Sequence, residues 1–192
     1  MDVDTIVPAR RAFLGRTSTL VLSGAAFVVL AGKESLAQGM AASSGDVAIL
    51  NVALGLEHEG INAYQLGAQS GLLQKGVLEV AVKFQSDHKA HRDALIATIQ
   101  KLGGTPVAEK KLDEYAKALK ADTLKSQADV LDLAARLELG AANAYLGVIP
   151  SFKDAQLAKI AGRLAADEVL HWTALMGALG RPLPADALPF GA

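Results

Sequence analysis

The sequence predicts an all-α fold, an antiparallel four-helix bundle with one long crossover between its second and third helices. The first observation is that apolar residues recur three and four positions apart in four long runs after residue 45. The second is that the two halves of the chain repeat each other. The third is that glycine followed by proline ends two of the runs. A chain of 192 residues with 51% apolar content can bury one core of this kind.

The first part of the chain, residues 1–37, is typical of an export signal. Arg10 and Arg11 precede the apolar stretch "STLVLSGAAFVVLAG", which is shorter than the roughly 18 residues that a spanning helix needs. Small residues up to Ala37 then form a cleavage site. The pattern resembles a twin-arginine signal, which implies the twin-arginine export machinery as a partner and a periplasmic or other extracytoplasmic location. An uncleaved membrane anchor is the alternative, and residues 38–45 are a predicted linker.

The predicted bundle covers residues 46–180, and a C-terminal tail, residues 181–192, follows it. Each of its four apolar runs is long enough for a helix that spans the height of a small domain. The connection 103–125 is long for a link between antiparallel neighbours and contains the short amphipathic piece "AEKKLDEYAKAL". It therefore suits one crossover along the bundle. The first run starts at residue 46, and the other three cover about 75–102, 126–148 and 154–179.

The two halves of the bundle are related by an internal repeat. The segments "EHEGINAY" (57–64) and "ELGAANAY" (138–145) share a glutamate and Asn-Ala-Tyr at a separation of 81 residues. The second and fourth runs match at a separation of 80, which places His91 on His171. The chain is therefore predicted to be a duplicated helical hairpin.

Glutamate and histidine side chains interrupt the apolar stripes near the middle of all four runs. Burying an ionised carboxylate without a partner costs several kcal/mol, and a shared metal ion removes that cost. Residues three apart on a helix share one face, so the Glu168 and His171 side chains can reach one metal. The chain has no cysteine, and oxygen and nitrogen donors suit iron or manganese, with zinc a weaker alternative. The predicted metal ligands are Glu57, His88, His91, Glu138, Glu168 and His171.

Glu57, Glu138 and the pair Glu168 with His171 resemble the di-iron carboxylate pattern of the ferritin-like superfamily. The single long crossover is also similar to that family, and the resemblance in topology covers residues 46–180. It implies a centre of one or two iron ions, in which Glu57 and Glu138 each ligate one metal or bridge. It also implies that Glu168 bridges and that His171 is a terminal ligand.

The second run departs from the ferritin-like pattern. His91 corresponds to the other terminal imidazole, but His88 stands where the family has a bridging glutamate. Asp87 is adjacent in sequence and lies about 100° round the helix. An asymmetric metal pair, a single metal and a zinc-like centre are therefore all left open.

Other polar residues lie close to the predicted ligands. Tyr64 and Tyr145 follow the glutamates by two turns. They are expected to donate hydrogen bonds near the site, to take part in electron transfer, or to be core residues with a satisfied hydroxyl. His58 and Glu59 are expected at the surface, with Glu59 the reserve ligand. Trp172 is expected to pack at the edge of the bundle.

The predicted function is an exported metalloprotein with redox activity toward oxygen or peroxide, and a di-iron-type oxidoreductase is one form of it. A metal-free relic bundle with a structural or stress-related binding role is the alternative. Iron storage in a cage is disfavoured, because only twelve residues follow Gly180. The charge balance of 19 basic and 20 acidic residues argues against a nucleic-acid partner. The sequence does not specify the redox partner or the oligomeric state, for which a homodimer stays open.

Overall fold

A computed structural model describes residues 40–191 of the chain, so the predicted export signal, residues 1–37, lies outside the described residues. Every regular element from residue 40 to residue 191 is helical, and no strand occurs there. The predicted all-α bundle is therefore confirmed. The elements in chain order are α1 (Met40–Gln69), α2 (Lys75–Lys101), α3 (Leu112–Ala118), η1 (Ala121–Thr123), α4 (Gln127–Val148), η2 (Ile149–Ser151) and α5 (Ala155–Ala178).

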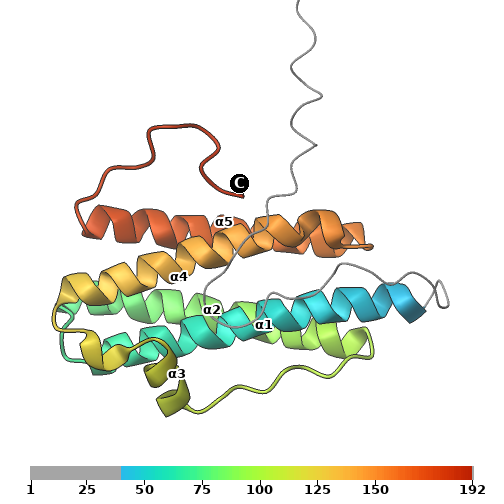
Figure 1. Cartoon of the computed structure of the whole chain (residues 1–192), viewed down its shortest axis with the longest axis horizontal. Coiled ribbons are helices and arrows are strands. Elements are labelled where there is room, and N and C mark those ends of the chain that lie inside the picture. The colour runs from blue at the N-terminus through green and yellow to red at the C-terminus, as the bar shows by residue number, and fades with distance from the viewer. Residues whose placement is uncertain (1–39, 192) are drawn as a thin grey trace, which may run out of the picture. The chain divides into compact units, whose positions relative to one another are not determined.

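The four long helices form two antiparallel hairpins. Helix α1 packs mainly on α2, and α4 packs mainly on α5, with the first hairpin below the second in Figure 1. The chain between α2 and α4 runs along the outside of the first hairpin and contains α3, which contacts α1. This is the single long crossover that the sequence predicts between the second and third long helices.

The ends of the helices follow local capping chemistry. The Ser126 side chain accepts a hydrogen bond from the backbone N–H three residues later at the start of α4, and the Asp154 side chain accepts one from the N–H two residues later at the start of α5. Gly103 and Gly180 follow α2 and α5 with φ values of 77° and 66°. Glycine adopts this left-handed conformation without a Cβ clash, so these two residues end the helices where the sequence predicts.

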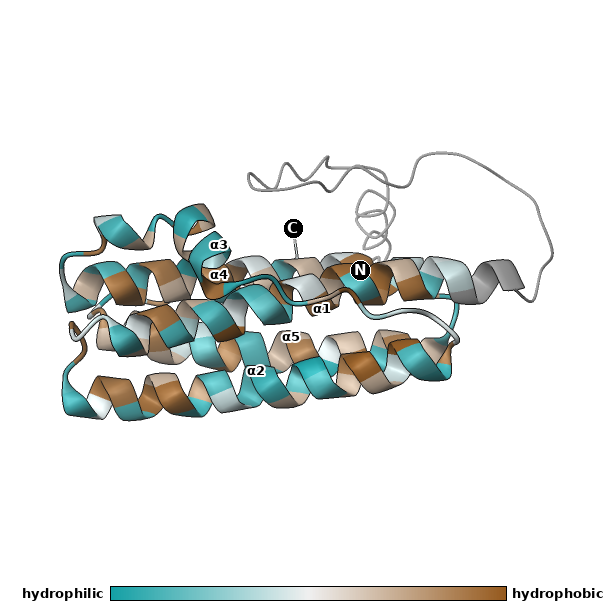
Figure 2. Cartoon of the chain, turned by 90° about the horizontal axis from the view of Figure 1, so that it is seen from below, coloured by the Kyte–Doolittle hydropathy of each residue, from teal (hydrophilic) through white to brown (hydrophobic). Residues whose placement is uncertain are grey.

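Helix α1 begins earlier than the apolar periodicity indicates. It starts at Met40 and so takes up most of the segment 38–45 that the sequence predicts as a linker. Hydrophilic and hydrophobic residues form separate stripes along the helices, and α2 shows the most hydrophilic face in Figure 2. Between residues 40 and 191, no helix combines the length and the apolar character that crossing a membrane requires.

The apolar core has a separate layer at each end of the bundle. One layer joins the start of α1, the end of α2 and the start of α5, and includes Leu54 and Ile99, which are both fully buried. The other joins the start of α4, the end of α5 and part of α2, where Trp172 packs edge-on against Phe190 with 5.3 Å between ring centroids. A polar layer lies between these two apolar layers.

The crossover covers one side of α1. The Asn51 side chain donates to the backbone oxygen of Thr105 (3.0 Å) and accepts from the backbone nitrogen of Val107 (2.6 Å). The ring nitrogen Nε2 of His58 lies 3.3 Å from the Val107 oxygen, and His58 is only 4% exposed. The prediction of His58 as a surface residue is therefore wrong, because a segment far along the chain shields it. Glu59 is half-buried and lies outside the polar layer's metal-ligand groups.

Candidate metal centre

The polar layer contains all six predicted ligand side chains. They come from the middle of α1, α2, α4 and α5, and each is at most 8% exposed. Their nitrogen and oxygen atoms form two groups in which the atoms lie within 4.8 Å of one another. Group A contains Glu57, His88, His91 and Glu168, and group B contains His88, Glu138, Glu168 and His171.

Glu168 contributes one oxygen to each group. Its Oε1 lies 3.3 Å from Nδ1 of His91, and its Oε2 lies 3.4 Å from Nδ1 of His171. His171 is one helical turn away on the same face of α5, whereas His91 reaches the carboxylate from α2. The carboxylate of Glu168 thus lies between the two groups.

His88 also faces both groups, with one ring nitrogen toward each. Its Nδ1 lies 2.7 Å from Oε2 of Glu57, and its Nε2 lies 3.2 Å from Oε1 of Glu138. The ring packs against α1 at Gly60, where an added Cβ would lie 3.2 Å from two ring atoms. The equivalent positions of the other half hold Ala141 and Glu168 in place of Gly60 and His88. A small residue on α1 therefore accompanies the larger side chain on α2.

The two tyrosines connect the hairpins through the same layer. The hydroxyl of Tyr64 on α1 donates to Oε1 of Glu138 on α4, and the hydroxyl of Tyr145 on α4 donates to Oε1 of Glu57 on α1. Each tyrosine thus supplies a hydrogen bond to the glutamate of the other half. The prediction that Tyr64 and Tyr145 donate hydrogen bonds near the site is confirmed.

Two aspartates that the sequence analysis did not select contact the outer side of the histidines. Oδ2 of Asp167 lies 3.2 Å from Nε2 of His91, and Oδ2 of Asp87 lies 3.4 Å from Nε2 of His171. A carboxylate at one ring nitrogen orients the ring and fixes the proton there, so the other nitrogen, Nδ1, is directed inward. The signal was present in the sequence, because the two aspartates obey the same 80-residue separation as the histidines.

Comparison with known proteins identifies the family of the chain. A family model described as a ferritin-like domain matches residues 45–181, which include all six residues of groups A and B. The chain belongs to the ferritin-like domain family. Among solved structures, the ferritin-like chain is similar to a conserved hypothetical protein, rv2844, from Mycobacterium tuberculosis, with 26% sequence identity and a TM-score of 0.60. That likeness covers 76% of this chain and 98% of the other. No curated protein matches the chain.

The pKa values of the three buried glutamates of this ferritin-like protein shift in different directions. Burial acts to raise the pKa of Glu57 and Glu138, but hydrogen bonds and charge from the histidines outweigh it and lower both values. Glu168 is fully buried, and there burial outweighs His171 and His91, so its pKa is raised. Burial and the neighbouring carboxylates together raise the pKa of Tyr64 and Tyr145, which keeps both hydroxyls protonated as donors.

The three histidines are held in the charged form when only protein groups surround them. Burial acts to lower their pKa values, but the glutamates outweigh it. The pKa of His88 rises well above its usual value, that of His91 rises to about 10, and that of His171 rises to about 9. Without a metal, the ferritin-like centre therefore balances three glutamates with imidazolium groups.

This balance leaves several buried atoms without a hydrogen bond. Both oxygens of Glu168, Oε2 of Glu138 and Nδ1 of His91 and His171 are buried and make none within the described part of the chain. Buried polar atoms in native proteins are nearly always satisfied, and each one left over costs about 1–3 kcal/mol. The two oxygens of Glu168 face Nδ1 of His91 and of His171 inside groups A and B, and all these atoms are ligand types for iron, manganese or zinc. The residues therefore fit a metal ion.

Proposed function

We propose that this ferritin-like protein is an exported metal-binding protein whose polar layer holds one or two iron ions and supports redox chemistry with oxygen or peroxide. One observation carries the proposal. Both oxygens of Glu168 and Nδ1 of His91 and His171 are buried and make no hydrogen bond within the described part of the chain, and these four atoms face each other in two pairs, at 3.3 and 3.4 Å, inside groups A and B. A cation in each group satisfies them together, whereas protein groups alone leave them unpaired.

The two groups would supply two metal positions that share Glu168, which offers one oxygen to each. Position A would have Glu57 and His91 as its own ligands, and position B would have Glu138 and His171. His88 faces both positions, and as a neutral imidazole it would ligate only one of them, because only one ring nitrogen then has a free lone pair. Iron, manganese and zinc all accept these donor atoms. We place iron first because Glu57, Glu138 and the pair Glu168 with His171 resemble the di-iron carboxylate pattern.

Bound iron supplies one-electron redox chemistry, and the protein's own residues set its surroundings. Tyr64 and Tyr145 hold Glu138 and Glu57 in place through hydrogen bonds from the opposite hairpin. Asp167 and Asp87 orient His91 and His171 by accepting a hydrogen bond from the outer ring N–H. The apolar layer that contains Leu54 and Ile99 keeps water from one side of the centre.

The test is the metal content of protein purified after export by a native host. We expect one to two metal ions per chain by elemental analysis in protein cleaved near Ala37. The double variant Glu168→Ala with His171→Ala is expected to lose the metal while circular dichroism shows retained helix. The matched control is Lys159→Ala with Arg163→Ala, which removes two exposed side chains from the same helix and is expected to keep the metal. A double variant at the centre that keeps its metal would contradict the proposal.

Export through the twin-arginine route is part of the same proposal and is supported by the sequence of residues 1–37. Replacing Arg10 and Arg11 by lysine is expected to hold the precursor in the cytoplasm, as measured by cell fractionation and the mass of the chain. Unchanged export of this variant would assign the segment to another route.

A metal-free structural bundle is the second candidate, and one observation favours it. Both ring nitrogens of His88 contact carboxylates, at 2.7 Å to Glu57 and 3.2 Å to Glu138, so the imidazolium form balances charge without a metal. This candidate predicts no stoichiometric metal in the exported protein and no change in thermal stability on chelation. The elemental analysis therefore separates the two candidates.

A further inference from the structure

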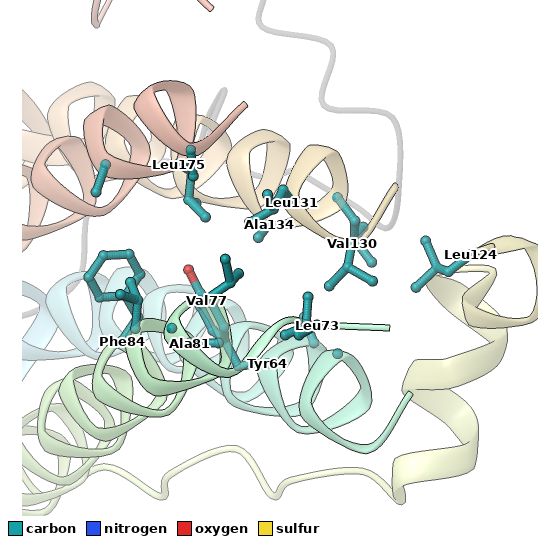
Figure 3. Close-up of a pocket in the computed structure, with 17 residues that line it drawn as sticks. Tyr64, Leu73, Val77, Ala81, Phe84, Leu124, Val130, Leu131, Ala134 and Leu175 are labelled. Atoms are coloured by element: carbon teal, nitrogen blue, oxygen red, sulfur yellow. The ribbon is translucent and has the colours of Figure 1, made fainter. Parts of the chain in front are cut away.

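A cavity lies beside the polar layer, at the end of the bundle where α1 leads into α2. It encloses about 160 Å³, and residues of both hairpins and of the crossover line it, as Figure 3 shows. Its lining is almost entirely aliphatic and aromatic carbon. Val80 on α2 and Ala174 on α5 line it and are exposed, so the cavity opens to solvent between these two helices.

The inner wall of the cavity is also a wall of the metal centre. Tyr64 lines the cavity and donates its hydroxyl proton to Glu138. Phe84 lines it as well and stacks on the ring of His171, with 4.1 Å between centroids and 28° between planes. A molecule in the cavity is therefore separated from group B by one layer of side chains.

The internal repeat shows that this space is not a general property of the bundle. At the opposite end, the equivalent positions form the packed apolar layer, in which Leu54 is fully buried and Leu157 is 5% exposed. Val77 and Val80 line the cavity and are the smaller counterparts of Leu157 and Ile160 in the packed layer. Two ends built from one duplicated pattern thus differ, because smaller side chains leave one of them hollow.

The size and lining of the cavity determine what it can bind. An engineered protein cavity of about 150 Å³ with an apolar lining stays free of water and binds benzene. A cavity of about 160 Å³ therefore holds a hydrocarbon group of about six to eight carbons. Among the residues that the structure describes, no charged side chain lines the cavity, so a polar or ionised molecule would lose its hydration there without compensation.

We infer that this cavity is a binding site for a hydrocarbon group and that it holds the apolar part of the molecule on which the metal centre acts. The binding itself stands on the cavity, whereas the role as a substrate site rests on the proposed function. The inner end of the bound group lies against Tyr64 and Phe84, and its outer end lies at the opening between α2 and α5.

Benzene and hexan-1-ol serve as probes, and methyl NMR spectra of the mature protein report where they bind. We expect saturable shifts for Val77, Leu131 and Leu175, which line the cavity, and none for Leu50 and Leu54 at the packed end. Shifts of equal size at both ends, or no shift with either probe, would overturn the inference.

Two variants test whether the cavity is the site. Ala134→Leu places a larger side chain in the cavity, and Ala174→Phe blocks the opening from an exposed position where folding is not at risk. Each is expected to weaken benzene binding at least tenfold. Ala128→Leu makes the same chemical change as the first variant at an exposed site on α4, and it is expected to bind like the unaltered protein. Unchanged binding in both cavity variants would refute the assignment.

A separate measurement tests whether the cavity is close enough to the metal centre to serve as its substrate site. Protein loaded with Mn²⁺ is expected to broaden the proton resonance of bound benzene more than metal-free protein does, because the paramagnetic ion lies one side-chain layer away. If benzene binds but the protein takes up no metal, the proposed function is refuted and the binding site is supported. If the protein takes up metal but does not bind benzene, only the binding site is refuted. If benzene binds without additional broadening, the role as a substrate site is refuted.

Discussion

Replacing the two tyrosines of the polar layer by phenylalanine tests how each buried glutamate is stabilised. Tyr145 is 2% exposed and lies within the packed apolar layer, and its hydroxyl donates to Glu57. Tyr145→Phe keeps the ring and removes that donor, so Glu57 loses a hydrogen bond where no water can replace it. Hydrogen bonds to charged groups contribute about 1.5–3 kcal/mol, and we expect a loss of about 2–3 kcal/mol in the free energy of unfolding.

Tyr64→Phe makes the same change at the equivalent position of the repeat. Tyr64 lines the cavity, and the hydroxyl that it loses points from the cavity wall to Glu138. Removal of the hydroxyl leaves an unpaired carboxylate oxygen beside a cavity that opens to solvent, so water that the apolar lining otherwise excludes gains a polar partner there, and we expect a loss of only about 1 kcal/mol. The two variants therefore separate the effect of the surroundings from that of the hydrogen bond.

Urea unfolding of the metal-free proteins, followed by circular dichroism, gives both free energies. Tyr115→Phe is the control, because its hydroxyl accepts a 3.3 Å hydrogen bond from the Lys110 nitrogen at a partly buried site and is not the donor to Glu57 or Glu138. We expect this control to lose about 0.5–1 kcal/mol. A Tyr64→Phe variant that loses as much as Tyr145→Phe, or more, would refute the reasoning.

Three further predictions concern the metal centre. Asp167→Asn removes the negative charge that orients His91, and we expect it to weaken metal binding about 10- to 100-fold in a chelator competition. The control Glu79→Gln changes an exposed carboxylate on α2 and is expected to leave the affinity unchanged. Equal affinities of the two variants would argue against the orienting role of Asp167. His88→Glu places a fourth carboxylate among three others, so we expect the melting temperature of the metal-free protein to fall. Metal loading is then expected to raise the melting temperature of this variant more than that of the unaltered protein. A melting temperature that does not depend on metal would contradict this prediction. Protons compete with the metal for the histidine nitrogens, and the pKa values of His91 and His171 are about 10 and about 9. We therefore expect the apparent affinity for the metal to rise as the pH increases toward 9. A metal affinity that falls over that range would be the contrary result.

Much of the fold follows from local sequence features. The apolar spacing together with Ser126, Asp154, Gly103 and Gly180 places the ends of α2, α4 and α5 within a residue or two of where the structure has them. The six ligand positions follow from the same spacing, because a polar residue on an apolar stripe must face the interior. Their function as ligands stays a prediction until metal content is measured.

Features that depend on segments far apart in the chain were not predicted. His58 is buried because the crossover at Val107 covers it, and helix periodicity carries no information about such a cover. Asp87 and Asp167 lie off the apolar stripe, and their contacts with histidines across the bundle depend on how α2 and α5 are placed. The cavity depends on how side chains of both hairpins and of the crossover come together in space, which the spacing of residues along a single helix does not specify.

The exchange of hydroxyl donors between the hairpins has a consequence for assembly. Each hairpin carries one acidic side chain, Glu57 or Glu138, whose hydroxyl donor is a tyrosine of the other hairpin. A chain cut within the crossover, near residue 120, gives two fragments that each lack the hydroxyl donor of their own acid. We therefore expect the separate fragments to remain largely unstructured and to gain their helices on mixing, so that the duplicated halves behave as complementary parts of one folding unit.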